Sequence, residues 1–156
     1  YGNSEGKRRI NAIIEDYKEI ISFLNEKYER KLLYGISLGG AILLNAIGSG
    51  VDYDAAVIDS SPSLLSEHGC PERIDPVANL PDDSGKLLVI TGAKDPVLKE
   101  GMTSLLRMEA KKRGASVIDG AEYSHPFMDQ SLAIHNKRMK SVLDHLVSFS
   151  SEGDGQ

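Results

Sequence analysis

The strongest constraint in this sequence is a serine placed between two glycines, where one apolar segment ends and another begins. Residues 35–39 read Gly-Ile-Ser-Leu-Gly, with the serine at position 37. Residues 31–35 are short and mostly apolar and predict a buried strand, whereas residues 40–47 predict a buried helix. A serine on such a turn projects its hydroxyl beside the free N–H groups of a helix N-terminus. Both glycines are expected because a Cβ atom at either position would collide with the tight turn.

The pentapeptide alone is weak evidence, because a glycine-rich turn with an incidental serine has the same letters. The rest of the chain alternates short apolar segments with helical ones. Further buried strands are predicted at residues 55–58, 86–91 and 115–119, and helices at 7–28, 99–113 and 131–149. Such alternation is typical of a parallel sheet with helices on both faces. We therefore predict an α/β fold with about four strands.

The sequence allows more detailed predictions for two helices and one loop region. The apolar stripe of helix 7–28 predicts that this helix covers the sheet. In helix 131–149 the residues expected to face inward are Leu132, Met139, Val142, Leu143 and Leu146. Residues 63–85 contain several prolines and predict a loop excursion with one or two helical turns. Residues 1–149 are interpreted as one partial domain, and we expect 150–156 to be a disordered polar tail.

Composition narrows the possible partners. The chain has 156 residues and a formal net charge of −5, so it lacks the basic field that nucleic-acid binding requires. No apolar run approaches the length of a membrane span. Cys70 is the one cysteine, which excludes an internal disulfide and is compatible with a reducing compartment such as the cytoplasm. His135 and His145 have no partners at a suggestive spacing and are interpreted as surface residues.

Polar residues with complementary chemistry follow the predicted strands in order. Ser37, Asp59 and Asp95 come directly after three of them, and His125 lies in the loop after the fourth. The carboxyl ends of parallel strands meet at one edge of a sheet, where sites collect. A serine needs an imidazole to take its proton, and a carboxylate to hold that imidazole in the correct tautomer. The order Ser, Asp, His therefore indicates nucleophilic catalysis.

At this point the chain resembles the alpha/beta-hydrolase superfamily. Residues 35–40 resemble its nucleophile elbow, and residues 88–97 resemble the strand and turn that carry its acid. Residues 120–125 are similar to its terminal histidine loop, and residues 1–6 to the turn after its fourth strand. The matches occur in order and run nearly the length of the chain.

The resemblance implies roles for individual residues. It makes Ser37 the nucleophile, Asp95 the acid, His125 the base and the backbone N–H of Leu38 one oxyanion donor. Asp59 remains an alternative acid, because it also ends a strand and some members of the superfamily take their acid there. The resemblance implies no metal and no organic cofactor.

The chain also departs from the superfamily pattern. The strands before the fourth-strand turn and the loop that supplies the second oxyanion donor have no counterpart. We expect the chain to be the C-terminal catalytic portion of a larger hydrolase, with the strand at 31–35 left as an unpaired apolar edge. The missing N-terminal half, or a partner chain, is expected to cover that edge.

The leading interpretation is a serine hydrolase that cleaves a small carboxylic ester or thioester through an acyl-enzyme. The alternative is an incomplete hydrolase half that is inactive without its missing strands and oxyanion loop. A third interpretation, a flavodoxin-like binding module with an incidental serine, explains less of the order of residues at the strand ends.

Overall fold

Four parallel strands form one sheet, and their order across the sheet follows their order in the sequence. The computed structural model describes residues 9–149, so the motif at 1–6 and the tail at 150–156 lie outside the described residues. The strands are β1 (Leu32–Ile36), β2 (Ala55–Asp59), β3 (Leu87–Gly92) and β4 (Ser116–Gly120). All three neighbouring pairs are parallel, so the four carboxyl ends lie at one edge. The predicted fold class is confirmed.

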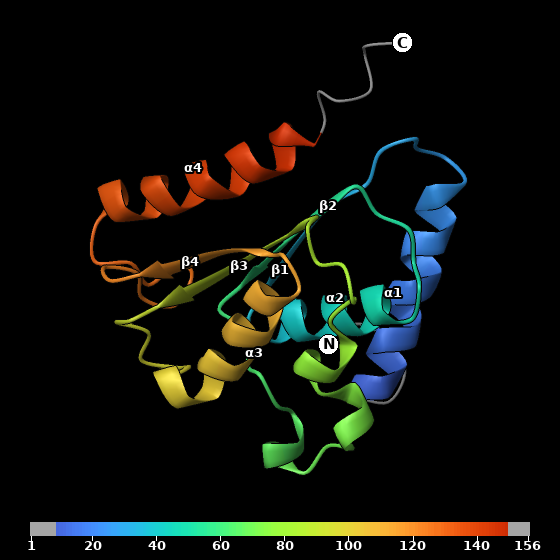
Figure 1. The fold of residues 1–156 in the computed structure, drawn as a ribbon, viewed down its shortest axis with the longest axis horizontal. Coiled ribbons are helices and arrows are strands. Elements are labelled where there is room, and N and C mark those ends of the chain that lie inside the picture. The colour runs from blue at the N-terminus through green and yellow to red at the C-terminus, as the bar shows by residue number, and fades with distance from the viewer. Residues whose placement is uncertain (1–8, 150–156) are drawn as a thin grey trace, which may run out of the picture.

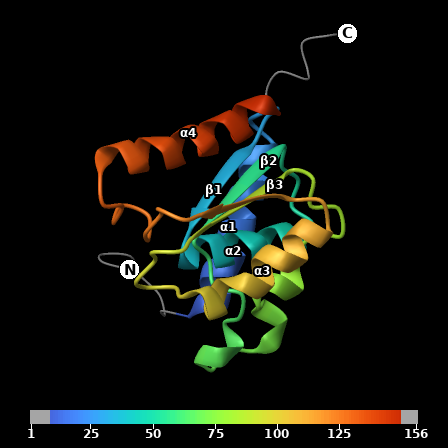
Figure 2. The same ribbon diagram turned by 60° about the vertical axis from the view of Figure 1, so that its left-hand side comes forward.

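Helices cover both faces of the sheet (Figures 1 and 2). On one face lie α1 (Ile10–Asn25), α2 (Leu38–Gly48) and α3 (Glu100–Lys112), and on the other lies α4 (Leu132–Ser148). Every residue of β2 is buried, as a central strand covered on both sides requires. The excursion between β2 and β3 holds three short 3-10 turns, at Ser66–His68, Glu72–Ile74 and Pro76–Asn79.

The apolar stripe of α1 covers the sheet only in part. The helix packs mainly against α2, and Ile14 and Ile21 are its buried residues. Tyr17 and Ile20 belong to the same stripe but are 42% and 53% exposed. Both residues line a groove that they share with residues of β1.

The inward face of α4 also differs from the prediction. Val142 is buried and Met139 and Leu146 pack against the core, whereas Leu132 and Leu143 are 73% and 56% exposed. The prediction follows hydrophobicity alone, whereas the helix turns the charged side chain of Arg138 towards the sheet.

β1 is an edge strand. It pairs with β2, and it has no second neighbour among residues 9–149. An apolar groove of about 380 Å³ runs beside it, lined by residues of α1, β1 and α2 that include Tyr17, Ile20, Leu33 and Ile36. The expected uncovered edge is therefore present in the described part of the chain.

Candidate active site

Ser37 occupies a strained turn between β1 and α2. Its φ of 53° and ψ of −123° place it where non-glycine residues are rarely found, at a cost of about 1–3 kcal/mol. The Ser37 N–H donates to the carbonyl of Asp59 at 2.9 Å, which fixes the turn to the end of β2. Backbone strain of this kind collects at functional sites, where it holds a side chain in one orientation.

The two glycines of the motif have different roles. A Cβ atom on Gly35 would lie 2.7 Å from the Cα of Gly40, so this glycine allows the start of α2 to approach the strand. A Cβ atom on Gly39 would meet nothing within 4 Å. The prediction that both flanking glycines avoid a collision is correct for Gly35 and wrong for Gly39, because residue 39 already lies on an open side of the helix.

Asp95 and His125 are in direct contact. The Asp95 Oδ2 atom lies 2.8 Å from His125 Nδ1, and the side chains are only 2% and 13% exposed. Asp95 Oδ1 accepts hydrogen bonds from the backbone N–H groups of Val97 and Leu98, both at 2.8 Å. The carboxylate is thus fixed at both oxygens, and an ionised carboxylate beside Nδ1 favours the tautomer that carries its proton there. Nε2 is then the ring nitrogen with a lone pair that can accept a proton.

The loops that carry this pair are held together through their backbones. The Lys94 N–H donates to the carbonyl of Tyr123 at 3.0 Å. A Cβ atom on Gly92 would lie 2.4 Å from the same carbonyl oxygen, so only glycine permits this approach. The end of β3 therefore fixes the histidine loop after β4.

The structure places Ser37 at the same sheet edge but does not join it to the pair. Among the described residues, no hydrogen bond connects Ser37 Oγ with His125. Such bonds are often long in the absence of substrate and tighten only in the reacting complex. Leu38 is the first residue of α2, so its backbone N–H has no acceptor one turn back in the helix and is free to donate.

Asp59 is engaged elsewhere. Its fully buried carboxylate accepts a hydrogen bond from Tyr34 Oη at 2.9 Å and pairs with Arg138 at 3.1 Å. Burial raises the pKa of Asp59, and the Arg138 cation opposes that shift. Burial, followed by the Asp59 charge, raises the pKa of Tyr34, so this hydroxyl remains a donor. The geometry favours Asp95 over Asp59 as the partner of His125.

The sequence analysis missed the buried charged group around Arg138. This arginine is 0% exposed, in the middle of α4, and it contacts Asp59 and Asp129. A signal was available, because position 138 lies four residues before Val142, on the stripe that faces the sheet. An arginine on an apolar stripe requires a buried partner.

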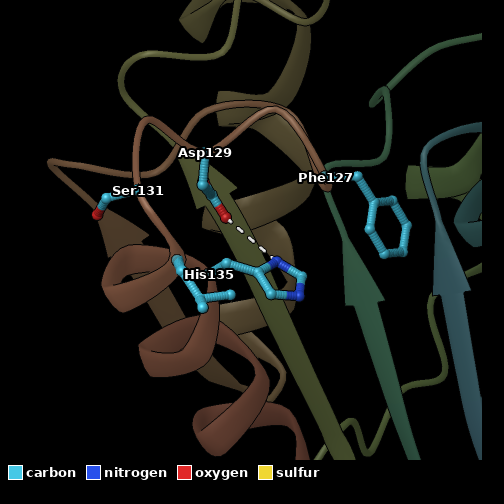
Figure 3. A pocket seen from close by; sticks show the side chains of 5 residues that line it. Phe127, Asp129, Ser131 and His135 are labelled. Atoms are coloured by element: carbon cyan, nitrogen blue, oxygen red, sulfur yellow. Dashed lines mark ion pairs between the residues drawn. The ribbon is translucent and has the colours of Figure 1, made fainter.

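A cavity of about 270 Å³ lies beside the histidine loop, and Figure 3 shows its lining. Phe127, Asp129 and His135 line it, together with Ser131 and Leu132 at the start of α4. The carboxylate of Asp129 points towards the His135 ring, with 3.8 Å between Oδ2 and Nδ1. Phe127 has a φ of 66° and is 74% exposed. None of the three candidate catalytic side chains lines this cavity.

Two histidines expected at the surface are partly buried. The His135 side chain is 28% exposed, and its ring lies 5.7 Å from that of Phe127. His145 Nε2 lies 3.1 Å from the carbonyl oxygen of Lys86. Burial lowers the pKa of His145 below its ordinary value.

Residues 9–149 contain neither a candidate metal centre nor a candidate membrane span. No group of three or more His, Cys, Asp or Glu side chains is arranged to hold a metal ion. No helix in this part of the chain combines the length and the apolar composition needed to cross a membrane.

The fold is shared with known hydrolases. No protein-family model matches the sequence, and no curated protein matches it. Among solved structures, a proposed dienelactone hydrolase from Klebsiella pneumoniae is similar over 90% of this chain and 62% of its own, with 17% identity and a TM-score of 0.70. An esterase from Pyrococcus furiosus is similar over 94% of this chain and 66% of its own, with 16% identity and a TM-score of 0.69.

An esterase domain from Rhodothermus marinus is also similar, with 18% identity and a TM-score of 0.62 over 88% of this chain and 66% of its own. The chain thus spans less than two thirds of the length of these proteins. Its described residues share the alpha/beta fold of these hydrolases, with four parallel strands in one sheet and helices on both faces.

Proposed function

We propose that this chain carries the catalytic residues of a serine hydrolase that cleaves a carboxylic ester or thioester. The observation that carries the proposal is the 2.8 Å contact between Asp95 and His125, at the sheet edge where Ser37 occupies its strained turn. Asp95 orients the imidazole, and a free backbone N–H at Leu38 follows the serine. These are the parts that acyl transfer to a serine requires.

The reaction follows from these parts. Ser37 Oγ attacks the carbonyl carbon while His125 Nε2 takes the hydroxyl proton, and the Leu38 N–H stabilises the oxyanion that forms. His125 then returns the proton to the departing alcohol or thiol, which leaves an acyl group on Ser37. A water molecule, deprotonated by His125, releases the acid and restores the serine. The short excursion between β2 and β3 favours a small substrate.

A fluorophosphonate probe tests this proposal, because it reacts with activated serines. Labelling of the chain is expected, and it should disappear in Ser37→Ala. Ser61→Ala is a matched control, since this serine follows the neighbouring strand and has its own hydrogen bond to the carbonyl of Pro62. Labelling that persists in Ser37→Ala would assign the reactivity to another residue.

The uncovered β1 edge favours a second candidate, a hydrolase half that needs further strands to become active. β1 has one strand neighbour in residues 9–149, and the groove beside it exposes apolar residues of α1. Such an edge is prone to pair with other chains. Labelling only after the chain is extended by the sequence upstream of Tyr1 in its reading frame, or joined to a partner, would support this candidate. Absence of labelling in every form would count against both.

A further inference from the structure

The Arg138 side chain is fully buried and makes several polar contacts. Its guanidinium donates to Asp59 Oδ1 at 3.1 Å, to Asp129 Oδ1 at 3.2 Å and to the carbonyl oxygen of Ser124. Its guanidinium carbon also lies 4.6 Å from the centre of the Tyr123 ring. One side chain therefore reaches the end of β2 and the loop after β4.

In the loop after β4, these contacts hold Ser124, the residue directly before His125. The Ser124 carbonyl accepts from Arg138, and the Ser124 N–H donates to Asp129 Oδ1 at 2.9 Å. Both backbone groups of Ser124 are thus held by the two members of one buried ion pair. A shift of Arg138 or Asp129 would move the backbone from which His125 projects.

On the serine side, the connection runs through Asp59. Its side chain pairs with Arg138, and its backbone carbonyl accepts the Ser37 N–H at 2.9 Å. Arg138 therefore contacts Asp59, which holds the Ser37 turn, and Ser124, which directly precedes His125. The ends of this connection are distant in the sequence, since Asp59 and Arg138 are 79 positions apart.

The energetics argue against a purely stabilising role. A buried ion pair is often no more stable than apolar residues of the same volume. Among the described residues, Arg138 Nε and Asp129 Oδ2 have no hydrogen-bond partner, although both are buried. Each such group costs stability. The arrangement makes better sense as a means of fixing geometry than as a means of stabilising the fold.

We propose that Arg138 is a positioning residue that sets the placement of His125 relative to Ser37. This inference rests on the proposed function, in which these two residues react together. Arg138 touches neither of them and acts through Ser124 and Asp59. Its removal should therefore disturb the catalytic geometry in chains that are still folded.

The test compares Arg138→Met with Leu106→Ala. Leu106 is 1% exposed on α3, in the core on the other face of the sheet, so its truncation destabilises the protein without touching the Arg138 contacts. Lys140→Met is the surface control on α4, since its ammonium pairs with the exposed Asp144. Two readouts are taken well below the unfolding midpoint of each variant. They are the rate of fluorophosphonate labelling and the nitrogen-15 NMR signal of the His125 Nδ1–H.

Arg138→Met is expected to label about 10- to 100-fold more slowly than Leu106→Ala and to lose the His125 Nδ1–H signal through faster exchange. Lys140→Met should match the wild type in both readouts. Equal labelling rates and an unchanged signal in Arg138→Met would overturn the proposal and leave the proposed function standing.

Two further outcomes remain decisive. If the wild-type chain is not labelled, the proposed function fails for this chain, and the NMR comparison alone decides whether Arg138 positions His125. If Arg138→Met does not fold, Arg138→Lys replaces it, because an ammonium keeps the charge but not the planar set of donors. Slower labelling and a lost signal in Arg138→Lys support the proposal, and wild-type behaviour refutes it.

Discussion

Gly35→Ala should damage both the fold and the proposed reaction, because the added methyl group meets backbone on α2. The new Cβ atom would lie 2.7 Å from Gly40 Cα and 2.9 Å from the Gly39 oxygen. Reaching the 3.4 Å of an ordinary contact requires a shift of about 0.7 Å between strand and helix. Overpacking of this kind costs about 1–3 kcal/mol, and for a chain of this size each kcal/mol lowers Tm by about 3 °C.

The same shift would displace Ser37, which lies between the two elements. Misplacement of a reacting group by about 1 Å can cost about 100-fold in rate, so fluorophosphonate labelling should slow by about 10- to 100-fold. Calorimetry and labelling kinetics measure the two effects separately.

Gly39→Ala is the matched control, because its Cβ atom would meet nothing within 4 Å. Alanine is also the better helix former by about 0.5–1 kcal/mol, so Tm should stay the same or rise slightly. Equal Tm values for the two variants would refute the argument that close approach of α2 is what requires glycine at position 35.

Three other perturbations have defined outcomes. Asp95→Asn should leave Tm within a few degrees but slow labelling of Ser37 by about 1,000-fold or more, because an amide no longer enforces the reactive tautomer; a rate near that of the wild type would assign the acid elsewhere. The pKa of His145 is lowered from 6.5 by burial, so its contribution to stability is present above that pH and is lost as the pH falls through the folded-state pKa. His145→Gln should therefore flatten the stability–pH curve below pH 6.5 in urea titrations, and an unchanged slope would contradict this assignment. Leu32→Lys places a charge on the exposed β1 edge and should reduce light scattering by concentrated protein, whereas unchanged scattering would show that this edge does not drive association.

Much of the fold could be predicted because its signals are local. Short buried strands, helical periodicity and the glycine-flanked serine each depend on neighbours a few residues away. Their order was enough to predict a parallel sheet and to place Ser37, Asp95 and His125 at its carboxyl edge. The bounds of the strands then differed from the predicted ones by no more than one residue.

The contacts of the two candidate acids needed the tertiary structure. Asp59 and Asp95 both follow apolar strands, and the preference for Asp95 rested on the resemblance of residues 88–97. Only the structure shows that Asp95 contacts His125 while Asp59 is held by Tyr34 and Arg138. Each of these contacts joins residues on different strands, loops or helices, and patterns along the chain do not show which of them meet.

The sequence by itself therefore determined the class of fold and the residue types available at one sheet edge, since both follow from patterns along the chain. The tertiary structure decided which of those residues meet, which glycine of the serine turn is required, and that an arginine occupies the inner face of α4. These features arise from contacts between segments far apart in the sequence, where burial and geometry rather than local periodicity determine the partner.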